Sequence, residues 1–186
     1  MKLRSIYHTS KGEKFFSIGR WIIGWTWFLG LFYGKWKSLP YNFSHEELWI
    51  PDEEQGYFWG IDGWQGQCFS STTRGDAEGV RFAPASEVLK HSERWSYIEF
   101  EVNEALYADI LVFMEMHAKW KTKYDFAGIM GFVVPLTPQD DDKWYCSELC
   151  NYIKAELNAI SEYSEPISPR RSAYELAKIW GEPKSL

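Results

Sequence analysis

One cysteine in this sequence has the surroundings that thiol chemistry needs. Cys146 directly follows Trp144 and Tyr145. The apolar residues after it recur at helical spacing: Leu149, Ile153, Leu157 and Ile160. A thiol in the first turn of a helix lies at the positive end of the helix dipole, which favours the nucleophilic thiolate. The simplest alternative is a buried cysteine that opens a core helix, because free thiols are commonly buried.

A cysteine nucleophile requires a base, usually histidine, and a third group that orients the base. Three of the four histidines are expected at the solvated surface: His8, His91 and His117. His45 lies in a strand-like run with Glu47 two residues on, so both side chains share one face. The carboxylate could then hydrogen-bond one ring nitrogen while the other nitrogen faces a thiol. A charged, solvated edge strand would explain Glu46 and Glu47 equally well.

The pattern along the chain predicts several antiparallel strands followed by helices. Strands are expected at residues 42–50, 57–64, 67–71, 80–84 and 95–102. Helices are expected within 15–33 and at 84–90, 104–121, 123–134, 146–160 and 172–180. Ser168 and Pro169 should begin the last helix. Residues 1–14 are interpreted as a polar leader, and the order of elements indicates an α+β fold.

Alternation in the histidine strand divides its side chains between two faces. One face is predicted to carry Phe43, His45, Glu47 and Trp49. The other is predicted to carry Ser44, Glu46, Leu48 and Ile50.

Composition limits the classes of protein and of partner. The 186 residues suit one domain, and aromatic residues reach 18%. A net charge of −6 without a long basic run argues against nucleic acid as the main partner. The three cysteines form no CxxC pattern, so no metal site or other cofactor is expected, and a reducing compartment is favoured. No secretory signal is evident, and we expect a cytoplasmic protein. The oligomeric state is not predicted.

An aromatic segment at residues 15–33 precedes the histidine strand. It is nearly long enough to cross a bilayer, but Arg20 interrupts it, and Ile18 and Ile22 also suit a helix packed on a core. Contact with a membrane surface is a further alternative, because tryptophan and arginine suit an interface. We therefore divide the chain into an N-terminal helical, aromatic-rich segment at 1–40 and a catalytic domain at 41–186, within a single globular unit.

Five short segments, taken in order, resemble the permuted papain-like cysteine amidases and peptidases. The segments are Phe43-Ser44-His45-Glu46-Glu47-Leu48, Cys68-Phe69-Ser70-Ser71, Gly79-Val80-Arg81, Tyr124-Asp125-Phe126-Ala127-Gly128 and Trp144-Tyr145-Cys146-Ser147-Glu148-Leu149. The order is similar to that of the YiiX-like branch of the NlpC-type superfamily, found in bacteria and their phages. In that branch the histidine strand comes first and the cysteine helix comes late.

The resemblance implies a circularly permuted papain-like fold, with helices packed on a small antiparallel sheet or partial barrel. It implies that Cys146 is the nucleophile, His45 the base and Glu47 the orienting group. Gln65 or Gln67 could orient the histidine instead, because the third residue varies across the superfamily.

The resemblance also suggests how the substrate would be held. The backbone N–H of Cys146 would help to form an oxyanion hole. Tyr124 or Tyr145 could add a hydroxyl donor, although a core role suits either of them. Trp144 and Tyr145 are candidates for the wall of a substrate groove.

Three features depart from the family pattern. The segment before the histidine strand is longer and more aromatic than expected. Glu46 occupies a position that is often apolar, and Cys150 lies one helical turn beyond Cys146. Cys150 is most simply a core residue, and Cys68 is most simply a strand residue near the site.

The resemblance implies a cysteine hydrolase that cleaves an amide bond through a thioester. Cell-wall peptides or other short peptides are the expected substrates. One alternative keeps the fold and acts on lipids, as the lecithin:retinol acyltransferase-like relatives do. A second alternative is a non-catalytic phage or effector protein that binds a partner through exposed aromatic residues.

Overall fold

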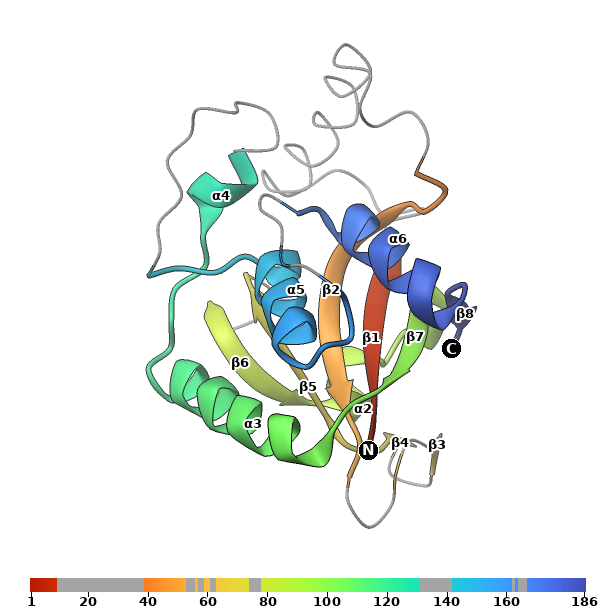
Figure 1. Ribbon diagram of the computed structural model, residues 1–186, viewed down its shortest axis with the longest axis horizontal. Coiled ribbons are helices and arrows are strands. Elements are labelled where there is room, and N and C mark those ends of the chain that lie inside the picture. Colours follow the sequence, from red (N-terminus) through yellow and green to blue (C-terminus); the bar gives the residue numbers. More distant parts are fainter. Residues whose placement is uncertain are drawn as a thin grey trace.

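The computed structural model describes residues 1–9, 39–52, 56, 59–60, 63–73, 78–130, 142–161, 163 and 167–186, with only the backbone described at 59–60. These residues form an α+β fold around a six-stranded sheet in the order β6-β5-β2-β1-β7-β8 (Figure 1). All of the pairings in it are antiparallel. The strands are β1 (Lys2–Thr9), β2 (Phe43–Ile50), β5 (Gln67–Thr72), β6 (Gly79–Pro84), β7 (Trp95–Glu101) and β8 (Lys184–Ser185). A separate hairpin pairs β3 (Trp59–Gly60) with β4 (Gly63–Trp64).

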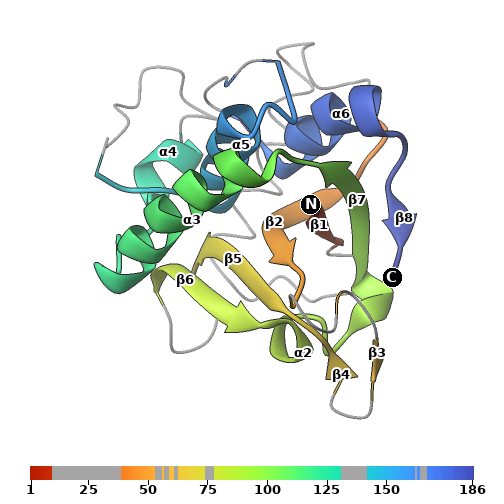
Figure 2. The ribbon, with the colours of Figure 1, turned by 60° about the horizontal axis from the view of Figure 1, so that its bottom comes forward.

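Helices cover both faces of this sheet. The helices are α2 (Ala85–Val88), α3 (Glu104–Lys119), α4 (Phe126–Met130), α5 (Cys146–Glu156) and α6 (Pro169–Trp180). Helices α3, α5 and α6 lie on one side, over a core that includes Leu48, Phe69, Leu149 and Ile153 (Figure 2). A smaller core on the other side joins Ala85 at α2 to residues of the strands: Ile6, Trp49, Cys68 and Trp95.

The first strand contradicts the predicted polar leader. Strand β1 lies in the interior of the sheet, between β2 and β7. Its polar side chains are stabilised by partners far along the chain: Ser5 donates to Glu46 at 2.7 Å, and Arg4 pairs with Glu99 at 3.0 Å. Both faces of β1 are therefore covered although its composition is polar, which is why hydrophobic alternation alone did not reveal it.

A β-bulge changes the side-chain pattern at the start of β2. His8 is opposite His45, but the next pair is Thr9 with Phe43, so Ser44 is the extra residue. Phe43 consequently stacks on Tyr7 at 5.0 Å, on the face covered by α5 and α6. The prediction that Phe43 shares a face with His45 is wrong, because the bulge interrupts strict alternation.

Strands β2 and β5 separate along their length. Their described pairing joins Leu48, Trp49 and Ile50 to Phe69, Cys68 and Gln67. Beyond it, β2 remains paired with β1 as far as Phe43, and β5 remains paired with β6 as far as Thr72. The start of α5 is held beside this opening, because the Ser71 hydroxyl donates to the Trp144 carbonyl at 2.6 Å. The fold thus brings the segment before Cys146 to the part of the sheet that contains His45.

Most other predicted elements are confirmed. Strands β2, β5, β6 and β7 and helices α2, α3, α5 and α6 lie where the pattern placed them, whereas β8 was not predicted. The single strand expected at 57–64 is instead divided between the two short strands of the hairpin, β3 and β4. The Ser168 hydroxyl accepts from Arg171 N–H at 3.3 Å, as expected for a helix cap. The predicted helix within 15–33 lies outside the described residues, as does the last part of the one at 123–134. Among the described helices, none combines the length and apolar character needed to cross a bilayer.

Candidate active site

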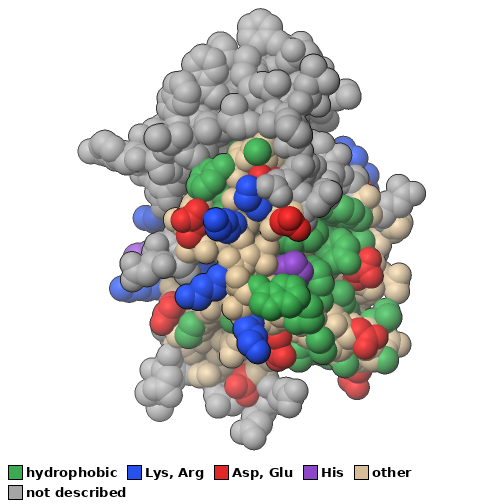
Figure 3. All heavy atoms as spheres, turned by 90° about the vertical axis from the view of Figure 1, so that its left-hand side faces the viewer, with side chains coloured by type: hydrophobic (Ala, Val, Ile, Leu, Met, Phe, Trp, Pro, Cys, Tyr) green, Lys and Arg blue, Asp and Glu red, His purple; other side chains and the backbone are tan. Residues whose placement is uncertain are grey.

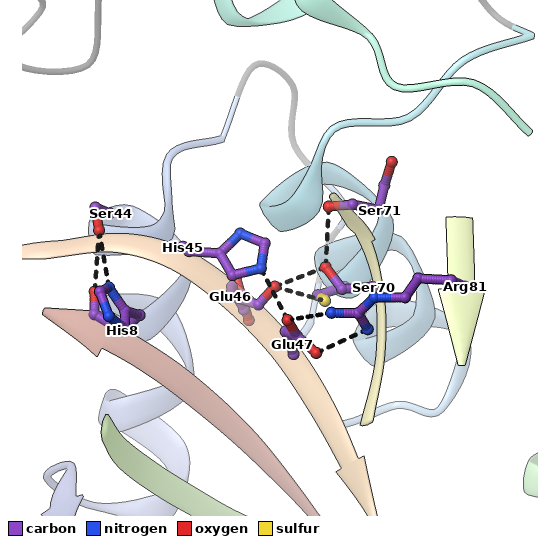
Figure 4. A network of polar contacts seen from close by, with 9 residues as sticks. His8, Ser44, His45, Glu46, Glu47, Ser70, Ser71 and Arg81 are labelled. Carbon is purple, nitrogen blue, oxygen red and sulfur yellow. Dashed lines mark hydrogen bonds and ion pairs between the residues drawn. The ribbon is translucent and has the colours of Figure 1, made fainter. Parts of the chain in front are cut away.

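His45 and Glu47 are in contact, as their shared strand face predicted. The Nε2 atom of His45 lies 3.0 Å from Oε1 of Glu47, and both side chains are buried (Figure 4). The Gln65 side chain donates to the Gly63 carbonyl, and Gln67 is exposed. Of the three candidates for the orienting group, Glu47 is therefore the one placed against the imidazole.

Arg81 of β6 completes this arrangement. Its guanidinium donates to both oxygens of Glu47, at 2.9 and 3.1 Å. Burial alone would raise the pKa of the Glu47 carboxyl, but the hydrogen bond with His45 and the charge of Arg81 outweigh it and lower that pKa to about 2. Glu47 is thus a fixed anion, bound by His45 of its own strand and by Arg81 of β6.

The negative charge of Glu47 determines which ring nitrogen of His45 carries a proton. An ionised carboxylate only accepts hydrogen bonds, so His45 Nε2 must carry a proton. In the neutral ring, Nδ1 then holds the lone pair. This is the form of histidine that can take a proton from a thiol.

The structure places Cys146 at the first position of α5, with a side chain that is 5% exposed. Helix α5 packs on β2 and β5. One turn after Cys146, the Sγ atom of Cys150 lies 3.8 Å from the Glu46 carbonyl oxygen. The first turn of α5 is therefore anchored to β2 beside His45 and, through Trp144, to Ser71 of β5.

A buried ion pair also fixes α5 on β2. The Nζ atom of Lys154 lies 2.6 Å from Oε1 of Glu46, and both side chains are 0% exposed. Lys154 also donates to Ser172 of α6, and its charge lies 5.9 Å from the centre of the Tyr7 ring. Glu46 therefore points to the helix face of the sheet, whereas His45 and Glu47 point to the face that carries Trp95 and Arg81. This pairing accounts for the buried acidic residue at position 46.

The predicted groove residues have different surroundings. Tyr145 is buried, and its hydroxyl accepts from the Ile167 N–H at 2.9 Å. Tyr124 is buried against Tyr145 and Ile129. Trp144 is half-buried and packs on Phe113 and Tyr152. The hydroxyl of Tyr145 is thus used in a structural hydrogen bond. Of the two candidate wall residues, Trp144 is the more exposed.

The other two cysteines differ from Cys146 in their positions. Cys68 lies in the small core beneath α2, and Cys150 lies in the larger core. Burial raises the pKa of both thiols, and nearby carboxylates (Glu47 for Cys68, Glu46 for Cys150) raise it further. These surroundings favour the unreactive thiol form at both positions.

Two histidines expected at the surface are covered. His8 is buried, with its ring 5.1 Å from Trp95 and its Nδ1 atom 3.4 Å from the Ser44 hydroxyl. His117 is half-buried in a cluster of aromatic rings, and burial lowers its pKa. Their polar sequence neighbours suggested solvent exposure, but β1 and the end of α3 each have covered faces. His91 is exposed, as expected.

Three residues that position the site were not assigned roles from the sequence: Arg81, Ser71 and Lys154. Arg81 lies between Val80 and Phe82, whose alternation could have shown that the arginine faces the opposite side from the larger core. No comparable local signal exists for the other two, since their partners are 73 and 108 residues away in the chain.

Comparison with protein-family models, curated proteins and solved structures found no match. The described residues also contain no group of three or more His, Cys, Asp or Glu side chains arranged to hold a metal ion. The family resemblance therefore stays a prediction based on the five sequence segments.

Proposed function

We propose that this protein is a cysteine hydrolase with a circularly permuted papain-like fold. An antiparallel sheet, an early histidine strand and a late helix that begins at a cysteine support the proposal. So does the packing of that helix on the histidine strand.

One observation supports the proposal most strongly. The imidazole of His45 is held by a Glu47 carboxylate that is itself fixed by Arg81, while Cys150, one turn beyond Cys146, touches the residue that follows His45. A buried carboxylate locked as an anion keeps a histidine in the right tautomer and stabilises its protonated form. A purely structural ion pair of Glu47 and Arg81 would not require the histidine.

In the proposed reaction, His45 Nδ1 takes the thiol proton of Cys146, and the sulfur attacks the carbonyl carbon of an amide. The backbone N–H at the start of α5 stabilises the oxyanion. The imidazolium then gives its proton to the leaving amine, and a thioester remains on Cys146. Water next attacks the thioester while His45 accepts a proton from it, and the carboxylic acid leaves as the thiol is restored.

The proposed substrates are short peptides, including cell-wall peptides. A second candidate, a lipid-directed acyltransferase or hydrolase of the same fold, is favoured by a specific observation. Trp144, two residues before Cys146, belongs to a cluster of rings that reaches the surface at Trp120. An apolar acyl group would be compatible with such surroundings.

Alkylation of the three thiols tests the proposal. With iodoacetamide near neutral pH, Cys146 should react at least about tenfold faster than Cys68 and Cys150, which serve as internal controls with raised pKa values. His45→Ala should slow the reaction of Cys146 and leave the other two unchanged. Equal, slow labelling of all three would contradict the proposal and favour a non-catalytic binding protein.

Substrate class is then tested with paired substrates that differ only at the scissile bond. Amide and ester versions of a short peptide and of a lipid would be compared in the wild type and in Cys146→Ala. Turnover of the peptide amide that Cys146→Ala abolishes supports the first candidate. Turnover confined to the lipid substrates would replace it with the second.

A further inference from the structure

The C-terminal half of α3 presents apolar side chains to solvent. Val112, Met116 and Trp120 are 57%, 40% and 65% exposed. They are spaced four residues apart, so they form one stripe along the helix. Most large apolar side chains of the described residues are buried or half-buried. Three exposed ones on the same face of one helix are therefore unusual.

Positive charge gathers beside this stripe. Lys119, Lys121 and Lys123 are all exposed and lie at or just after the end of α3. Glu115 is the acidic residue in the same turns. Since the chain as a whole carries a net charge of −6, this end of α3 is locally opposite in sign to the rest. Figure 3 shows hydrophobic side chains gathered around a histidine on this side of the molecule, with Lys or Arg side chains along one edge of the group and Asp or Glu side chains also bordering it.

One side of the exposed tryptophan contacts another aromatic ring. The ring of His117 lies edge-on to Trp120 at 6.1 Å and to Trp144 at 6.2 Å. His117 itself is held by Thr122, whose hydroxyl oxygen lies 3.0 Å from Nδ1. Trp120 therefore packs against His117 on one side, while the rest of its ring is exposed to solvent.

We propose that this α3 surface, made of Val112, Met116, Trp120 and the three lysines, docks on a membrane that contains anionic lipids. Tryptophan suits the boundary between headgroups and acyl chains, and lysines next to it attract anionic headgroups. A protein partner fits less well, because three side chains on one helix are too small an area for a stable protein interface of about 1,200 Å² or more.

The proposal goes beyond the hydrolase proposal and does not depend on it. Docking here would hold the ring cluster that ends at Trp144, two residues before Cys146, close to the lipid. Its test is a binding measurement without turnover, so an inactive enzyme could still dock and an active one could fail to dock.

Flotation with vesicles tests the docking. The wild type should float with vesicles of phosphatidylcholine mixed with phosphatidylglycerol. It should not float with vesicles of pure phosphatidylcholine. Changing Lys119, Lys121 and Lys123 together to Glu should weaken binding by about a hundredfold or more, since each lysine near an anionic surface contributes roughly fivefold. Trp120→Ser should also reduce binding.

Matched variants elsewhere control for charge and exposure. Lys90, Lys178 and Lys184 changed together to Glu alter the net charge equally, and Ile179→Ser removes an apolar side chain that is 54% exposed on α6. Both should bind like the wild type. Absence of wild-type binding, or an equal loss in the control variants, would overturn the proposal. Self-association that the α3 variants abolish, without vesicle binding, would instead identify a second copy as the occupant.

Discussion

The sulfur of Cys150 lies 3.8 Å from the carbonyl oxygen of Glu46. The thiol is one helical turn from Cys146, and the carbonyl directly follows His45 in β2. Helix α5 therefore touches the histidine strand at the point where β2 and β5 separate. A shift of α5 along β2 would break this contact and, one turn further along the helix, the pairing of Lys154 with Glu46.

The stability of the fold should depend on Lys154 and Glu46 being present together or absent together. Glu46→Gln leaves the Lys154 ammonium buried without its counterion and should cost about 3 kcal/mol of unfolding free energy in urea. Glu46→Leu combined with Lys154→Met removes both charges and should recover most of that loss. Glu46→Leu and Lys154→Met would also be measured singly, and a double variant whose loss of stability equals the sum of these two single losses would contradict this account.

Acid should weaken the fold through Glu47. The pKa of its carboxyl is about 2 in the folded protein against an ordinary 4.5, so its contribution is present above about pH 4.5 and is lost as pH falls toward 2. The loss should approach about 3 kcal/mol in urea titrations at successive pH values. Glu47→Gln should remove this part of the pH dependence. Glu99→Gln should have a smaller effect, because that carboxylate is partly exposed.

The hydroxyl of Ser71 should hold the start of α5 in place. Ser71→Ala removes its hydrogen bond to the Trp144 carbonyl and should cost about 1 kcal/mol of stability. We also expect slower alkylation of Cys146, because the turn that contains it loses its link to β5. Ser168→Ala is a suitable control: it removes the cap of α6, with a similar cost, and should leave the labelling rate unchanged.

Gly79 should not tolerate a side chain. It has φ of +100°, and a Cβ atom there would lie 2.2 Å from the Thr122 carbonyl oxygen, which accepts from Val80 N–H. Gly79→Ala should therefore cost about 3 kcal/mol, through backbone strain and the steric clash together. Gly56→Ala is the matched comparison, with φ of +67° and open space around it, and should cost only about 1 kcal/mol. Thermal unfolding of the two variants would measure the difference.

The local pattern of apolar and polar residues predicted those elements whose two faces carry different kinds of side chain. The period of two in β2 correctly placed His45 beside Glu47, and helical spacing placed Cys146 at the start of α5. Both predictions rest on residues a few positions apart. Contacts of that range follow from the geometry of one strand or one helix.

Long-range polar pairing was beyond the reach of the same reasoning. Ser5, which is polar, is buried in β1 because Glu46 accepts its hydrogen bond from 41 residues away. Arg81 likewise reaches Glu47 across 34 residues. The sequence does not indicate which distant residue will form a hydrogen bond with a polar side chain. Strand β1 and the pairing of Arg81 with Glu47 could therefore be recognised only in the folded structure.

The interior position of β1 also constrains how the chain folds. This strand pairs with β2 on one side and with β7 on the other, so Leu3 lies opposite Phe100, nearly a hundred residues later. Closing such long loops is slow, because their entropy is lost before the contacts form. During synthesis, β1 can pair with β2 but must wait for β7 before its second edge is covered. Until then, the strand that borders the proposed active site keeps an open edge that another chain could occupy.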